Sequence, residues 1–177
     1  MTDVRLIPMT AAERRKFVEE ELANYADQQI RDAGWPPAEA LDRARAELEP
    51  VLERELDCAQ RNGEKLWSAV ERDGESVGWL WVRPAHATGS FLNQITVAAP
   101  HRRRGYGRAM LAALEELVAA DGIDEVQLNV NVANEPARRL YDAAGYEQVG
   151  EDGRLRRLRK RLDTRRRGRG IDSRGRG

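Results

Sequence analysis

Arginine and glycine dominate the stretch from Arg102 to Gly107, which leads directly into a helical pattern from Arg108 to Ala120. The first N–H groups of a helix have no partner within the helix, and the helix dipole places partial positive charge there, so the main chain can bind an anion. Gly105 and Gly107 let the backbone approach a ligand closely, while positive charge comes from Arg102, Arg103, Arg104 and Arg108. The pattern predicts a phosphate-binding loop, and a solvated Arg/Gly turn is the alternative.

Two common phosphate loops do not match this stretch. A P-loop carries Lys-Ser or Lys-Thr after its last glycine, and a dinucleotide-binding loop carries three glycines early in a βαβ unit. Here Arg108-Ala109 follows Gly107, and a third glycine is missing. A third kind of phosphate loop is therefore expected.

Two motifs in this chain resemble the signatures of the GCN5-related N-acetyltransferases (GNAT). The pyrophosphate-loop signature reads Arg102-x-x-Gly105-x-Gly107 and follows Ile95-Thr96-Val97 and Pro100. The second signature, Asn-x-x-Ala-x-x-Leu-Tyr-x-x-x-Gly-Phe/Tyr, is matched from Asn134 to Tyr146. The resemblance covers residues 4–162 and is greatest to a bacterial subgroup of uncharacterised GNAT proteins.

The resemblance implies an α/β GNAT fold, in which a central mixed, mostly antiparallel twisted sheet of about six or seven strands is flanked by about four helices. The residue pattern gives a compatible order, β-α-α-β-β-β-α-β-α-β-β. Residues 1–162 would form a single acetyltransferase domain, and residues 163–177 a disordered Arg/Gly-rich tail.

The function implied by the resemblance is N-acetyl transfer from acetyl-CoA, the cosubstrate, to a primary amine of a small molecule or a protein. The amine would attack directly in a ternary complex, without a metal. A non-catalytic acyl-CoA-binding regulatory module is the alternative. A nucleic-acid partner is not expected, because only the tail has a suitable composition and it lacks aromatic residues for stacking on bases.

The resemblance also assigns roles to individual residues. The Val97 amide would polarise the thioester carbonyl, and Tyr141 would protonate the departing thiolate as a general acid. Glu71 is the candidate base, acting through water, because the acidic residue that many relatives carry before the loop is replaced by Asn93 and Gln94. Acetyl-CoA contacts are expected from Ile95, Val97, Arg102, Arg103, Arg104, Gly105, Tyr106, Gly107, Arg108, Asn134, Ala137 and Tyr141.

Structural roles compete with several of these assignments. Asn134 stands where it would cap the following helix, and Tyr141 could pack in the core. Glu71 could be a solvent-facing strand end. The single Cys58 is expected to pack under a helix or to sit unreactive at its end, because the nearby Glu55 and Asp57 disfavour a thiolate.

The elements that must position these residues can be read from hydrophobic period and turn residues. Thr10 and Glu13 form a capping box at a helix start, Gly34 separates two helices, and Pro50 should kink the second. Asp73-Gly74 predicts a two-residue hairpin turn. The expected strands are 4–9, 65–72, 75–82, 91–97, 125–132, 146–149 and 154–162, with a polar loop over 83–89.

Charge is balanced overall but uneven along the chain, which has 30 basic and 30 acidic residues among 177. The last fifteen residues carry six arginines and two aspartates, and residues 10–60 carry thirteen acidic and seven basic residues. This acidic segment would attract a cationic amine, although charged outer faces are normal for exposed helices. With no signal or membrane-spanning pattern, we expect a cytoplasmic protein without a membrane partner, and the resemblance allows a homodimer.

Overall fold

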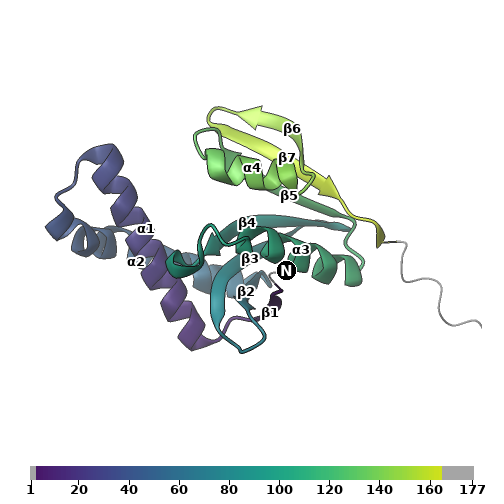
Figure 1. Ribbon diagram of the computed structural model, residues 1–177, viewed down its shortest axis with the longest axis horizontal. Helices are drawn as coiled ribbons and strands as arrows, with labels where there is room; N and C mark the ends of the chain where they lie inside the picture. Colours follow the sequence, from purple (N-terminus) through teal and green to yellow (C-terminus); the bar gives the residue numbers. More distant parts are fainter. Residues whose placement is uncertain (1–2, 165–177) are drawn as a thin grey trace, which may run out of the picture. The chain divides into compact units, whose positions relative to one another are not determined.

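The computed structural model describes residues 3–164, and Figure 1 shows its helices and strands. Seven strands form one sheet in the order β1-β2-β3-β4-β5-β7-β6, with four α-helices, which confirms the expected mixed α/β fold. Contacts divide the chain into two compact units. Unit 1 comprises residues up to Arg83 together with Asn93–Met110, and unit 2 comprises Pro84–Leu92 together with the chain from Leu111 onward. That residues 1–162 form a single domain stays a prediction.

Unit 1 begins with β1 (Arg5–Pro8), α1 (Ala11–Ala33), α2 (Pro37–Arg61) and β2 (Lys65–Val70). The N-cap half of the expected capping box is confirmed, since the Thr10 side chain accepts a hydrogen bond of 3.2 Å from the Glu13 N–H, while the Glu13 carboxylate accepts from Lys16 and Trp79. Gly34 ends α1 in the left-handed conformation, with φ of 68°. The two helices pack against each other (Figure 1). The apolar cluster on this side of unit 1 contains Phe17, Val18, Leu22, Leu52, Leu56, Trp79 and Ala98.

The expected boundaries are wrong at two hairpins. Five residues, 71–75, separate β2 from β3 (Ser76–His86), and a hydrogen bond between Glu71 and Glu75 closes a turn of three residues, 72–74, in place of the expected two. The Gly74 N–H donates to Glu71 O at 3.0 Å and the Glu71 N–H to Glu75 O at 2.9 Å, while Gly74 has φ of 88°, the geometry of a type I turn with a bulge. The expected loop over 83–89 is mostly strand, because β3 continues to His86 and β4 (Gly89–Val97) starts three residues later.

The remaining elements are α3 (Tyr106–Ala120), whose first turn belongs to unit 1, and β5 (Glu125–Asn131), α4 (Glu135–Ala143), β6 (Glu147–Asp152) and β7 (Leu155–Arg161) in unit 2. Strand β5 pairs antiparallel with β7 over its whole length. It also pairs in parallel with β4 over Gly89–Leu92, and β4 passes into unit 1 at the next residue.

Two further expectations concern the helices and the tail. Helix α2 runs from Pro37 to Arg61 as one element with Pro50 inside it, and the kink expected at Pro50 stays a prediction. Within residues 3–164, no helix combines the length and the apolar character needed to cross a membrane. The tail from residue 165 lies outside the described residues.

Candidate functional site

The candidate phosphate loop connects β4 to α3 in unit 1. A short 3-10 helix, Ala99–His101, follows β4, and the loop then turns through two left-handed residues, Arg103 with φ of 63° and Gly105 with φ of 88°. Among residues 3–164, Arg103 alone has a positive φ without being glycine. Such a conformation costs a non-glycine residue about 1 kcal/mol or more, so the loop path is imposed by its surroundings. Its N–H groups at the start of α3 suit an anion.

Arg102 ties this loop to α1. Its Nε donates to Val97 O at 3.0 Å, and its Nη2 donates to Glu20 Oε1 at 2.6 Å and to Asn24 Oδ1 at 2.7 Å. The Ala99 N–H donates to the same Glu20 oxygen at 2.9 Å. The Arg102 guanidinium is therefore engaged by protein acceptors, although Arg102 is an exposed residue like Arg103, Arg104 and Arg108.

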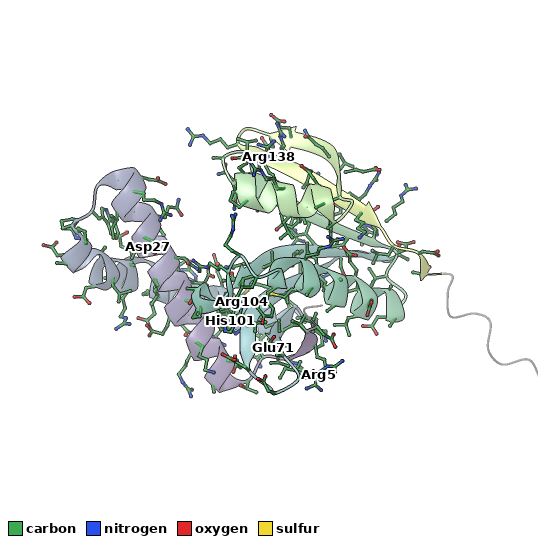
Figure 2. All side chains as sticks on the ribbon, viewed as in Figure 1. Arg5, Asp27, Glu71, His101, Arg104 and Arg138 are labelled. Carbon is green, nitrogen blue, oxygen red and sulfur yellow. The ribbon has the colours of Figure 1, made fainter. Side chains whose placement is uncertain are left out.

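Tyr106, the first residue of α3, is buried with 4% of its surface exposed. Its hydroxyl donates to Glu71 Oε1 at 2.5 Å, and this bond raises the pKa of the phenol. His101 packs edge-on against the ring, and the Arg104 guanidinium lies 5.4 Å from the ring centre. Figure 2 shows Glu71, His101 and Arg104 gathered here. Glu71, the predicted base, thus accepts a hydrogen bond that positions the start of α3.

A second carboxylate, missed from the sequence, meets β4 next to Val97. The Thr96 hydroxyl donates to Glu21 Oε1 at 2.9 Å, and the Gln94 amide donates to Thr96 Oγ1 at 3.3 Å. Burial raises the pKa of Glu21, repulsion from Glu20 adds to the rise, and hydrogen bonds from Thr96, Gln94 and Asn24 oppose it. This Glu21 was hidden in a run of three glutamates that suggests a solvated helix face.

The sequence does contain a signal for Glu21. It stands three residues after Val18 and next to Leu22, both buried, so the helical period places it at the edge of the apolar stripe of α1. Glu64, another acidic residue near β4, accepts a hydrogen bond of 2.5 Å at Oε2 from Trp81 Nε1. The Asn93 side chain donates to that oxygen at 3.2 Å.

Ion pairs between α1 and α2 compensate part of the acidic charge in residues 10–60. Arg14 bonds Glu53 and, at 2.7 Å, Asp57, while Arg45 bonds Glu19 at 2.9 Å. These pairs use exposed carboxylates, so they reduce the field that would attract a cationic amine. Attraction of the acceptor by this segment stays a prediction.

The second motif forms α4 in unit 2. The Asn134 side chain accepts a hydrogen bond of 3.2 Å from the Ala137 N–H, which confirms its capping role. Tyr141 is 6% exposed and packs edge-on against Tyr146, with 5.7 Å between ring centres. Burial raises the pKa of Tyr141 to about 12. Arg138 of α4, labelled in Figure 2, donates to Val132 O at 3.1 Å and fixes the start of the helix.

The known proteins that this chain resembles are acetyltransferases by name. The sequence profile described as the Acetyltransferase (GNAT) family matches residues 28–146. An uncharacterised N-acetyltransferase from Bacillus subtilis, YycN, is 28% identical over 149 residues, 82% of this chain and 94% of its own length. Mycothiol acetyltransferase from Acidimicrobium ferrooxidans is 36% identical over 126 residues, 68% of this chain and 38% of its own length.

Solved structures have the same fold. The crystal structure of YycN has a TM-score of 0.63 and 27% identity, covering 85% of this chain and 96% of that one. The PaiA N-acetyltransferase of Thermoplasma acidophilum, solved with coenzyme A, has a TM-score of 0.67 at 16% identity, covering 90% and 99%. The spermidine N-acetyltransferase of Vibrio cholerae, solved with CoA and spermine, has a TM-score of 0.65 at 18% identity, covering 92% and 97%.

Proposed function

Because the chain belongs to the GNAT family of acetyltransferases, we propose that it transfers the acetyl group of acetyl-CoA to a primary amine. The amine of a small molecule or a protein attacks the thioester directly in a ternary complex. The observation that carries the proposal is the left-handed loop Arg103–Gly105 at the start of α3, whose geometry suits a pyrophosphate. Structural relatives solved with coenzyme A support the choice of cosubstrate.

In this proposal the main chain from Arg102 to Arg108 holds the pyrophosphate, and the exposed side chains of Arg103, Arg104 and Arg108 add charge-assisted contacts. Ile95 and Val97 bind the pantetheine arm through main-chain groups, in the manner of an added strand. The same arm contacts Asn134 and Ala137 at the start of α4. The Arg102 side chain contributes indirectly, by fixing the loop through Val97 O and Glu20.

The Val97 N–H stabilises the oxyanion that forms on the thioester carbonyl. One such preorganised donor is worth about 3 kcal/mol. Thr96 and Val97 share the peptide that carries this N–H, and the Thr96 side chain is anchored to Glu21 on α1. The donor is therefore held by helix α1 as well as by the sheet.

Tyr141 protonates the thiolate as it leaves. A phenol with a pKa of about 12 is neutral at physiological pH and so carries the proton that must be given away. Transfer to a free thiolate with a pKa of about 8.5 is uphill by about 5 kcal/mol, so the proton moves as negative charge builds up on the sulfur during C–S cleavage.

Calorimetric titration with acetyl-CoA, CoA, ATP and NAD tests this function without knowledge of the acceptor. We expect micromolar binding of the two CoA compounds alone. Gly105→Ala should weaken acetyl-CoA binding at least tenfold, because an L-residue resists φ of 88° and would displace the loop.

Gly122→Ala is the matched control, since Gly122 has φ of 82° and nothing within 4 Å of an added Cβ. It should destabilise the fold and leave binding intact. Equal binding by Gly105→Ala and the wild type would refute the loop assignment. Tight acetyl-CoA binding without release of CoA in the presence of any amine would favour the acyl-CoA-binding regulatory module.

A further inference from the structure

The chain lacks a carboxylate at the β4 positions Asn93 and Gln94, yet helix α1 supplies one at the same strand. We propose that Glu21 is the general base of the acetyl transfer, taking a proton from the ammonium group of the acceptor. This assignment rests on the function proposed above. It places the base on the helix and not on the strand, where the sequence motif would have it.

Position is the first argument for Glu21. Its Oε1 accepts the Thr96 hydroxyl at 2.9 Å, and Thr96 directly precedes Val97, the proposed oxyanion donor. Neighbouring Cα atoms are about 3.8 Å apart, so the carboxylate is anchored one residue from the proposed oxyanion donor. A nucleophile that attacks that carbonyl must place its N–H groups in this neighbourhood.

The hydrogen-bond order around Thr96 is the second argument. Gln94 Nε2 donates to Thr96 Oγ1 at 3.3 Å, so the Thr96 hydroxyl hydrogen is available for Glu21. Thr96, Gln94 and Asn24 hydrogen-bond Glu21, and a carboxylate has about four acceptor sites, so one site remains for an incoming ammonium. Glu21 is also half-buried, which leaves one part of it accessible and desolvates the rest.

The two neighbouring glutamates of α1 differ in charge compensation, and this difference is the third argument for Glu21. Glu20 forms an ion pair with Arg102 at 2.6 Å and is thereby compensated. No ion pair of Glu21 is present among residues 3–164, and its facing groups are Asn24 and Glu20 on α1, with Thr96 and Gln94 on β4. Desolvation and Glu20 raise the pKa of Glu21, which brings it nearer to the range of an effective base at neutral pH.

The other candidate carboxylates are already engaged as acceptors. Glu71 receives the Tyr106 hydroxyl at 2.5 Å. Glu64 receives two N–H groups at one oxygen, from Trp81 at 2.5 Å and from Asn93 at 3.2 Å. Both of these contacts have clear structural uses, in holding α3 and in joining β3 to β4.

The proton balance of the step is complete without another reactant. The ammonium gives one proton to Glu21, the nitrogen lone pair forms the C–N bond to give the oxyanion, and the C–S bond breaks as the oxyanion collapses. Tyr141 gives its proton to the thiolate, and the second proton, which leaves the nitrogen after the C–N bond forms, passes through solvent to restore Tyr141. Glu21 then releases its proton to solvent, so the products are the amide, free CoA and one proton.

Glu21→Gln, Glu71→Gln and the control Glu19→Gln should be assayed for CoA release with acetyl-CoA and a panel of spermidine, lysine amide and a short peptide. Glu19 is exposed and pairs with Arg45, so its variant should stay within twofold of the wild type. Glu21→Gln should lose at least 100-fold in kcat at pH 7, as expected for removal of a general base.

The loss should shrink toward pH 10, where the free amine becomes abundant, and acetyl-CoA affinity should not change. A Glu21→Gln profile that parallels the wild type at all pH values overturns the assignment. A selective loss in Glu71→Gln would return the role to that residue. Failure of the wild type to bind acetyl-CoA would instead contradict the proposed function.

A readout independent of the acceptor completes the test. The side-chain carboxyl carbon of Glu21, identified by its absence in Glu21→Gln, is titrated by NMR in the acetyl-CoA complex. The proposal predicts a midpoint above the ordinary glutamate value of about 4.3. A midpoint at that ordinary value overturns the role of Glu21 as base even when no panel amine reacts.

Discussion

Replacing Gly78 with alanine should displace the Thr96–Val97 peptide, which carries the proposed oxyanion donor. Gly78 lies in β3, and a Cβ added to it would lie 2.3 Å from Thr96 O and 2.9 Å from Met110 Cε. The methionine can rotate, but the carbonyl belongs to the Thr96–Val97 peptide. Reaching the 3.0 Å limit of real Cβ contacts requires that peptide to shift by about 0.7 Å, the difference between the two distances.

The expected cost follows from that geometry. Overpacking in a well-packed region costs about 1–3 kcal/mol, and we take the upper end because backbone is displaced. Alanine gains back about 0.5–1 kcal/mol over glycine in a strand, so Gly78→Ala should lose about 2 kcal/mol of unfolding free energy. For a chain of this size that is about 4–8 °C in Tm.

Denaturant and thermal unfolding, with kcat measured alongside, provide the assay. Gly150→Ala is the control, because the nearest atom to its added Cβ is Arg157 Cβ at an ordinary 3.8 Å. In Gly89→Ala the three atoms nearest to the added Cβ all belong to the His86 ring, the first at 2.2 Å, and that exposed side chain can swing away. Stability of Gly78→Ala within about 0.5 kcal/mol of Gly150→Ala would refute the reasoning.

Three other predictions concern the same network. In a double-mutant cycle of unfolding, Arg102→Ala and Glu20→Gln should be non-additive, with a coupling energy of about 0.5–1 kcal/mol that falls with added salt. Strict additivity would contradict the proposal that this ion pair ties the loop to helix α1. Tyr141→Phe should lower kcat about 100-fold and leave acetyl-CoA affinity unchanged, and unchanged turnover would refute the role of Tyr141 as general acid. Because the pKa of Tyr141 is raised to about 12, its ionisation should not affect the pH–rate profile of the wild type below pH 10. The pKa of Glu21 is raised in the folded protein, so the contribution of Glu21 to stability is full below about pH 4.3 and is lost as pH rises through the folded pKa. Over that pH range the wild type should lose unfolding free energy relative to Glu21→Gln, as measured by unfolding at a series of pH values. A constant difference between the two proteins would contradict the burial of the carboxyl.

Local signals in the sequence were enough to predict the elements around the candidate loop. Thr10 with Glu13 marked the start of α1, and Gly34 marked its end, because capping and left-handed conformations depend on single residue types. The residue spacing from Arg102 to Gly107 predicted a loop before a helix, and the phosphate-binding role of that loop stays a prediction. The left-handed conformation at Gly105 is one that glycine adopts readily, whereas the residue type at Arg103 does not predict its left-handed conformation.

Long-range contacts explain what the sequence could not predict. The Arg102 guanidinium looked like part of the phosphate site, but α1 captures it through Glu20 and Asn24, which precede it by 82 and 78 positions. Glu21 reaches Thr96 across 75 positions. No local sequence pattern predicts either pairing. The residues at the end of β3 were expected to form a polar loop, but the strand continues to His86.

The central claim is tested most directly by mass spectrometry of a primary-amine panel incubated with acetyl-CoA and the protein. We predict that at least one amine gains a single acetyl group, with release of an equal amount of free CoA. This product should be greatly reduced with Glu21→Gln and retained with Glu19→Gln. Binding of acetyl-CoA with no acetylated amine and no CoA release would contradict the claim that this chain is an N-acetyltransferase.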